Sequence, residues 1–138
     1  TLKRYFETAR NNLVSDGVLF LDAFGGYECN KVAKDRHKYG DFTYIWDQAA
    51  FDPVTHKMQC HIHFRFPDGS KLDRAYSYEW RLWGLPEITE LLAEAGFART
   101  TVYWQGTDED NGEADGIFVP VEHGDADPAW LAYIVAEK

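Results

Sequence analysis

Residues 85–105, LPEITELLAEAGFARTTVYWQ, decide the fold because they encode a helix, a stop and a strand in immediate succession. Pro86 suits the first helical turn, where its missing N–H is not needed. A set of apolar side chains recurs at helical spacing: Ile88, Leu91, Leu92 and Ala95. Gly96 stands where a left-handed residue ends a helix. Residues 99–104 then predict a strand, so the stretch is typical of an α/β protein.

Segments at both ends of the chain have the same α/β character. The first 13 residues place apolar side chains at helical spacing: Leu2, Tyr5, Phe6, Ala9 and Leu13. After a turn at residues 15–17, the apolar run 18–21 predicts a strand buried on both faces of a parallel sheet. Residues 130–136 (WLAYIVA) are a second continuous apolar run and predict another central strand.

The middle of the chain changes to strand alternation. Residues 41–51, 58–66 and 71–79 predict three antiparallel strands, with a hairpin turn at residues 67–70 (PDGS). We expect residues 41–83 to be a β insertion within one domain of residues 1–138. Residues 28–40 are polar and predict a loop or a poorly ordered helix. Residues 107–115 predict an acidic solvated loop, and residues 116–121 are strand-like.

Composition restricts the class of protein. The chain has 138 residues, of which 45% are hydrophobic, which is enough for one domain with a core. The formal net charge of −9 disfavours a nucleic-acid partner, because an acidic surface repels phosphates. No apolar run approaches the roughly 20 residues that a membrane helix needs. The two cysteines, Cys29 and Cys60, form no CxxC pair, so a reduced, cytoplasmic protein is the plainer interpretation, although one disulfide stays open.

Several motifs together resemble those of class I S-adenosylmethionine-dependent methyltransferases. The helix and strand at residues 7–26 resemble the family's "a-R-x-L-x-x-G-G-x-x-x-x-D" segment at Ala9, Arg10, Leu13, Gly17 and Asp22, with Asp16 in place of the first glycine. The opening stretch resembles "E-x-x-x-L-L-x-x-A-G-F" at Glu87, Leu91, Leu92, Ala95, Gly96 and Phe97. Residues 130–138 resemble the family's last strand, which returns antiparallel between two neighbours.

The resemblance implies a partial Rossmann-like sheet of α/β class, α+β in appearance, with an inserted antiparallel meander that covers the substrate. The family's glycine-rich cofactor loop has no counterpart here. Gly25-Gly26 follows a strand, but it lacks a third glycine and opens no amphipathic helix. The resemblance therefore implies the C-terminal half of an enzyme that uses S-adenosylmethionine, without cofactor-binding residues of its own and inactive alone. The start at Thr1 also indicates a fragment, from cloning or proteolysis, which we expect to form a homodimer.

Candidate substrate-binding residues lie at two places. Asp22 and Tyr27 follow the first predicted strand, at the edge where open α/β sheets build their sites; a loop cap and a turn explain them equally well. The meander carries a dense aromatic cluster with one cation: Tyr44, Trp46, Tyr76, Tyr78, Trp80, Trp83 and Arg81. From it we select Tyr44, Trp46, Tyr78, Arg81 and Trp83. The rings would hold a cation and Arg81 a substrate carboxylate, although packing in a core is the commoner role of such rings.

A metal site is not expected. His61 and His63 alternate with Cys60 along one strand, so the thiol and the imidazoles point to opposite faces, with the histidines facing solvent or a ligand cleft. No catalytic residue emerges from residue order alone. The leading hypothesis is therefore part of a methyltransferase that acts on a small-molecule or other acceptor. A non-enzymatic module that binds a small ligand in an aromatic pocket, and a domain that binds a partner protein, remain alternatives.

Overall fold

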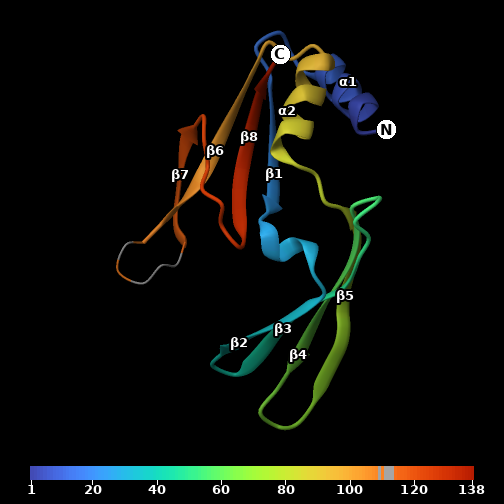
Figure 1. Ribbon diagram of the computed structural model, residues 1–138, viewed down its shortest axis with the longest axis vertical. Helices are drawn as coiled ribbons and strands as arrows, with labels where there is room; N and C mark the ends of the chain where they lie inside the picture. Colours follow the sequence, from blue (N-terminus) through green and yellow to red (C-terminus); the bar gives the residue numbers. More distant parts are fainter. Residues whose placement is uncertain (109, 111–113) are drawn as a thin grey trace. The chain divides into compact units, whose positions relative to one another are not determined.

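The computed structural model describes residues 1–108, 110 and 114–138. It contains two α-helices and two four-stranded sheets, a mixed α+β arrangement (Figure 1). The chain divides into two compact units. The first unit combines Thr1–Tyr27 with Trp83–Lys138, and the second unit is Glu28–Leu82, between them in sequence. No helix among the described residues is long and apolar enough to cross a membrane.

The sheet of the first unit has its last strand in the middle. Its strands are β1 (Val18–Gly25), β6 (Arg99–Thr107), β7 (Ala114–Val121) and β8 (Trp130–Glu137), in the order β1-β8-β6-β7. Strand β8 is antiparallel to β1 on one side and to β6 on the other, as Figure 1 shows. The prediction of a final strand that returns antiparallel between two neighbours is confirmed.

The prediction for β1 was wrong in two respects. Within the described residues β1 pairs with β8 alone, and the pairing is antiparallel, not parallel. It is also covered on one face only: Leu19 and Leu21 pack on the core, whereas Val18 is 51% and Phe20 58% exposed. A purely apolar run carries no alternation, so periodicity could not show that one face is open.

Both helices cover the other face of this sheet. Helices α1 (Leu2–Asn12) and α2 (Leu85–Glu94) pack on β8, and the buried core consists of Phe6, Ile88, Leu92, Phe97, Ile134 and Ala136. Leu92 is fully buried and Phe6 is 1% exposed. Burial of each such side chain stabilises the fold by about 1.5–3 kcal/mol. The helical stripe predicted for residues 85–95 is therefore confirmed as a core element.

Helix α2 ends through two backbone hydrogen bonds that require a glycine. The N–H of Phe97 donates to the carbonyl of Leu92, and the N–H of Gly96 donates to Ala93. This pair of bonds is a Schellman motif, which needs a left-handed residue at its corner. Gly96 has φ +93°, a value that side chains disfavour. The motif turns Phe97 back onto the helix, where it is 6% exposed and belongs to the core.

The second unit is a four-stranded antiparallel meander. Its strands are β2 (Ala33–Tyr39), β3 (Phe42–Phe51), β4 (Lys57–Arg65) and β5 (Lys71–Arg81), paired in sequence order. The 3-10 helix η1 (Tyr27–Asn30) precedes them. The hairpin turn at residues 67–70 is confirmed, with Gly69 at φ +83°.

Two predictions for loops need correction. Residues 28–40 were expected to be a loop or a weak helix, but they form η1 and the edge strand β2, whose side chains are almost all exposed. A strand whose two faces are both exposed to solvent has no alternation of apolar and polar residues, so periodicity does not identify it as a strand. The acidic loop predicted at 107–115 lies partly outside the described residues; Thr107 belongs to β6, and β7 begins at Ala114.

Candidate substrate-binding site

Strand alternation gathers the aromatic residues of the meander on one face. Register places Gln48 opposite Cys60 and Cys60 opposite Tyr78, so these three share a face. One rung further along, Met58 lies between Phe51 and Trp80. A bulge between Gln48 and Ala50 keeps Phe51 on the same face as Met58, because it inserts one extra residue into β3.

Three rings form an aromatic trio on this face: Trp46, Tyr78 and Trp80. Tyr78 and Trp80 stack with centroids 4.4 Å apart and planes 28° from parallel. Trp46 lies 6.5 Å from Tyr78 and 6.3 Å from Trp80, centroid to centroid. These separations fall in or near the range where aromatic pairs attract beyond their burial. Each ring of the trio therefore packs against the other two.

Gln48 holds the trio in place. Its side-chain oxygen accepts a hydrogen bond from Nε1 of Trp46 at 3.3 Å. Its nitrogen donates to the carbonyls of Glu28 and Lys31, each at 3.0 Å, and so ties η1 to β3. Gln48 is 7% exposed. Loss of a buried amide with three such bonds would cost more than a surface bond, since its partners would lose their hydrogen bonds inside the protein.

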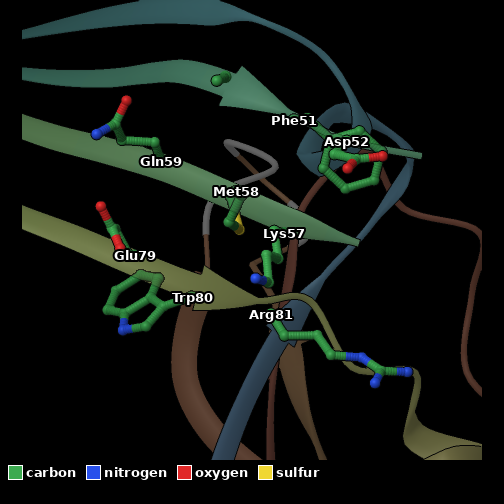
Figure 2. Close-up of a pocket in the computed structure, with 9 residues that line it drawn as sticks. Phe51, Asp52, Lys57, Met58, Gln59, Glu79, Trp80 and Arg81 are labelled. Atoms are coloured by element: carbon green, nitrogen blue, oxygen red, sulfur yellow. The ribbon is translucent and has the colours of Figure 1, made fainter. Parts of the chain in front are cut away.

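Beside the trio, the ends of β3, β4 and β5 enclose a concavity of about 540 Å3 (Figure 2). Its lining combines apolar and charged residues: Ala50, Phe51, Asp52, Lys57, Met58, Gln59, Glu79, Trp80 and Arg81. In Figure 2, Gln59 and Glu79 project to the same side of neighbouring strands, whereas Trp80 projects to the other side. Trp80 is the residue that the trio shares with the concavity, whereas Lys57, Gln59, Glu79 and Arg81 alternate onto the opposite face of their strands.

The charges of the concavity are arranged by its strands and turn. Lys57 and Arg81 lie directly opposite each other across β4 and β5. Asp52 accepts hydrogen bonds from the Val54 N–H at 2.9 Å and the Thr55 hydroxyl at 2.8 Å. These bonds lower the pKa of Asp52, and the bond from Val54 has the largest effect. Asp52 therefore shapes the turn, and the surface that remains for a ligand combines an indole face with cationic and carboxylate side chains.

The opposite face of the meander carries a hydrogen-bonded polar network. Asp47 accepts from Lys34 Nζ at 2.9 Å and contacts His63 Nε2 at 3.0 Å. Burial raises the pKa of Asp47, but the hydrogen bonds from Lys34 and His63 outweigh burial, and the net pKa is lowered. His61 Nδ1 lies 2.8 Å from the Ser77 hydroxyl. His61 and His63 are 4% and 8% exposed, so the prediction that they face solvent was wrong.

No metal site is seen in the part of the chain that the structure describes, where no three His, Cys, Asp or Glu residues converge. Cys60 lies on the aromatic face, away from the histidines, as alternation predicts. Both Cys29 and Cys60 are buried thiols that form no disulfide. Burial, followed by the charge of Cys29, raises the pKa of Cys60 to about 11.

The glycine pair after β1 is explained by packing. A Cβ atom on Gly25 would lie 2.3 Å from Cζ2 of Trp130, and one on Gly26 would lie 2.3 Å from the carbonyl oxygen of Pro128. Gly26 also has φ +113°. Since the 128–130 segment occupies the space that both missing side chains would need, this pair does not cradle a phosphate.

The structure groups three of the seven predicted substrate residues: Trp46 and Tyr78 belong to the trio, and Arg81 lines the concavity. Tyr44 packs against Phe64 instead, at 6.0 Å. The other three lie elsewhere: Asp22 is exposed within β1, Tyr27 is 63% exposed at the start of η1, and Trp83 packs on the core of the first unit.

The sequence interpretation missed several lining residues: Phe51, Asp52, Lys57, Met58, Gln59 and Glu79. The signal that could have found them is strand pairing. A hairpin at residues 67–70 sets β4 against β5, so a residue near Trp80 on β5 implies neighbours near Met58 on β4. That register also depends on a bulge between Ile62 and Phe64, which no local sequence feature announces.

Comparison with known proteins gives a fold likeness only. No protein-family model matches the chain, and no curated protein matches its sequence. A S-adenosylmethionine-dependent methyltransferase from Clostridium acetobutylicum matches 98% of this chain over 50% of its own, with a TM-score of 0.59 and 15% identity. The CcbJ methyltransferase from Streptomyces caelestis matches 96% over 48%, with a TM-score of 0.57 and 12% identity. The chain thus spans about half the length of each structure and shares the fold of the matched half.

Proposed function

We propose that this chain is the C-terminal part of a class I S-adenosylmethionine-dependent methyltransferase that methylates a small molecule. One observation carries the proposal: β8 runs antiparallel between β1 and β6, in a chain of which 98% and 96% align with about half of two methyltransferases. Helix–glycine–strand units are common, but a last strand inserted between its predecessors is a more specific topology.

In this proposal S-adenosylmethionine binds to residues outside the chain. The sequence has no glycine-rich loop between a strand and a helix, and Gly25-Gly26 is filled by residues 128–130. The open face of the first unit fits the same proposal. Val18 and Phe20 expose large apolar side chains on a sheet whose other face is covered. The remainder of the enzyme would cover this face, and in isolation a second copy of the chain would do so.

The aromatic trio and the adjoining concavity would hold the methyl acceptor. A volume of about 540 Å3 suits a small molecule, and the stacked faces of Tyr78 and Trp80 suit a planar or cationic group. Arg81 would orient an acceptor carboxylate. The transferred methyl group is already activated on sulfur, so the contribution of these residues is orientation. Asp22, Tyr27, Tyr44 and Trp83 remain proposed contacts of the complete enzyme, and a cytoplasmic location remains a prediction.

Calorimetry with S-adenosylmethionine tests the proposal. Residues 1–138 alone should release no binding heat, whereas the protein encoded together with the sequence upstream of Thr1 should bind the cofactor. Micromolar binding by residues 1–138 would show that the cofactor site lies in this half. An upstream sequence without a strand followed by a glycine-rich loop would contradict the methyltransferase assignment itself.

The second candidate is a non-enzymatic module that binds a small aromatic ligand. The observation in its favour is that the trio and the concavity lie wholly within Glu28–Leu82. The two candidates differ in one measurement. The long protein here is the one encoded together with the sequence upstream of Thr1. If Trp80→Leu reduces both its ligand binding and its methyl transfer, the enzyme is supported. If it reduces ligand binding and the long protein neither binds S-adenosylmethionine nor transfers a methyl group, the module is supported.

A further inference from the structure

A second groove lies in the first unit, within residues that the methyl-acceptor site does not use. Helix α2, strand β6 and the end of β7 enclose about 470 Å3, lined by Leu85, Pro86, Thr89, Glu90, Val102, Trp104, Val121, Glu122, His123 and Gly124. This volume lies in the range of sites for small ligands. The groove lies wholly within the first unit.

The interior of the groove is apolar. Val102 and Val121 are cross-strand partners and lie side by side on β6 and β7. The hydroxyl of Thr89 points back to its own helix, with the carbonyls of Leu85 and Pro86 each 3.1 Å away. Since its hydroxyl serves the helix, Thr89 offers mainly its methyl group to the groove. A ligand that enters therefore needs an apolar body.

Trp104 forms an aromatic wall that is held in place from two sides. Its ring lies 5.2 Å from that of Trp130, centroid to centroid. On the other side, a Cβ atom on Gly124 would lie 3.0 Å from the Trp104 ring, so the backbone there approaches as closely as only glycine permits. A fixed indole face attracts cations through its quadrupole.

The charges of the lining are of one sign. Glu90 and Glu122 are exposed carboxylates, neither lysine nor arginine lines the groove, and His123 counts as neutral in the formal charge at pH 7. The whole first unit is acidic: residues 1–27 and 83–138 hold five of the 14 Lys and Arg but fifteen of the 23 Asp and Glu. A negative field of this kind concentrates cations at the surface.

We propose that this groove binds a small organic ammonium ion. Its apolar body would lie against Val102, Val121 and Trp104, and its cationic head would be neutralised by Glu90 and Glu122. The aromatic wall, the apolar interior and the anionic rim together select for this chemical class, because a neutral molecule would forgo the charges and a metal ion would forgo the apolar surface. The groove shares no lining residue with the methyl-acceptor site, and its proposed ligand does not rest on the methyltransferase proposal.

The test compares choline with 3,3-dimethylbutan-1-ol, its neutral isostere in which carbon replaces the charged nitrogen. Both ligands are titrated into the full chain at low salt, and the indole N–H signal of Trp104 is followed by 1H–15N NMR. Choline should give a saturable shift that weakens as salt is added, and the alcohol should bind at least about fivefold more weakly.

Variants locate the effect. Glu90→Gln combined with Glu122→Gln removes the anionic rim through exposed side chains and should weaken choline binding about fivefold or more. Glu7→Gln combined with Glu94→Gln removes the same charge from the same unit outside the groove and should change binding less than about twofold. Both double variants should keep the wild-type spectrum elsewhere, which establishes folding.

Three results would overturn the proposal. These are the absence of a saturable shift at Trp104, equal binding of choline and the alcohol, and equal weakening by the two double variants. Titration with Nα-acetyl-lysine amide is the fourth arm. Tighter binding of this compound than of choline would assign the groove to a lysine side chain of a partner protein, and would refute a small-molecule ligand.

Discussion

Replacement of Gly96 by alanine tests how helix α2 ends. At φ +93°, an alanine would carry a strain of about 1–2 kcal/mol, near the upper end because this angle lies beyond the left-handed minimum. Alanine also restricts the unfolded chain, which offsets about 0.4–1 kcal/mol. The new Cβ would lie 3.3 Å from Nε and 3.4 Å from Cζ of Arg10, so that side chain must shift. We expect a net loss of about 1–1.5 kcal/mol.

Native-state hydrogen exchange measures this loss within one unit. The amide of Ile134, in the central strand β8, should exchange about five- to tenfold faster in Gly96→Ala. Gly69→Ala supplies the matched control, because Gly69 has φ +83° and no atom lies within 4 Å of its missing Cβ. In Gly69→Ala, the opening free energy measured at the amide of Cys60, in the second unit, should fall by about 1 kcal/mol, which is the backbone strain alone.

A double-variant cycle separates strain from crowding. In an Arg10→Ala background, Gly96→Ala should cost a few tenths of a kcal/mol less, because the side chain that crowds the new Cβ is gone. A Gly96→Ala protein that loses less than about 0.3 kcal/mol would refute the reasoning, since the helix would then tolerate a different ending.

Three further predictions follow from the contacts described above. The lowered pKa of Asp47 stabilises the fold above the unfolded pKa of about 3.9, and this stability is lost as pH falls through the folded pKa; Asp47→Asn should therefore flatten the acid limb of urea-denaturation midpoints between about pH 2 and 5, and an equally steep limb would contradict this. With a pKa of about 11, Cys60 should be almost entirely protonated at pH 8 and react with a disulfide reagent far more slowly in native than in denatured protein; equal rates would contradict its burial. Phe20→Asp should convert the proposed dimer to monomer in sedimentation experiments, whereas a monomeric wild-type chain would refute the proposal that a second copy covers the open face.

The elements that the sequence predicted well are those whose signals are local. Pro86 and Gly96 mark the two ends of α2, and the residues between them repeat with helical period. The turn at residues 67–70 is equally local, because its proline, aspartate and glycine each favour a turn conformation. Such features depend on neighbours in the chain, so tertiary packing confirms them instead of competing with them.

Strand direction and edge strands were harder to predict. The apolar run of β1 fits a buried parallel strand and a half-exposed antiparallel strand equally well. Strand β2, from Ala33 to Tyr39, gains its conformation from pairing with β3, and nothing in its polar side chains records that pairing. Both outcomes are decided by contacts with residues distant in sequence.

The sequence indicated that aromatic residues of the meander would form the candidate site, but not which of them would meet. Aromatic density at Trp46 and Tyr78 indicated a ligand surface on the meander, and these two rings do meet. Tyr44 lies only two residues from Trp46 on the same face, yet it packs with a different ring. Bulges and twist decide which of several equivalent rings converge, and those features come from the whole sheet.

The central position of β8 has a consequence for synthesis of the protein. Strands β1 and β6 are both synthesised before β8 and do not pair with each other; among the described strands, each of them pairs with the later strand β8. Until residues 130–137 appear, β1 has no partner among the described strands, whereas β6 can already pair with β7 and contact α2. We therefore expect the core around Ile134 and Ala136 to close late, in a step that joins β8 to the distant strand β1.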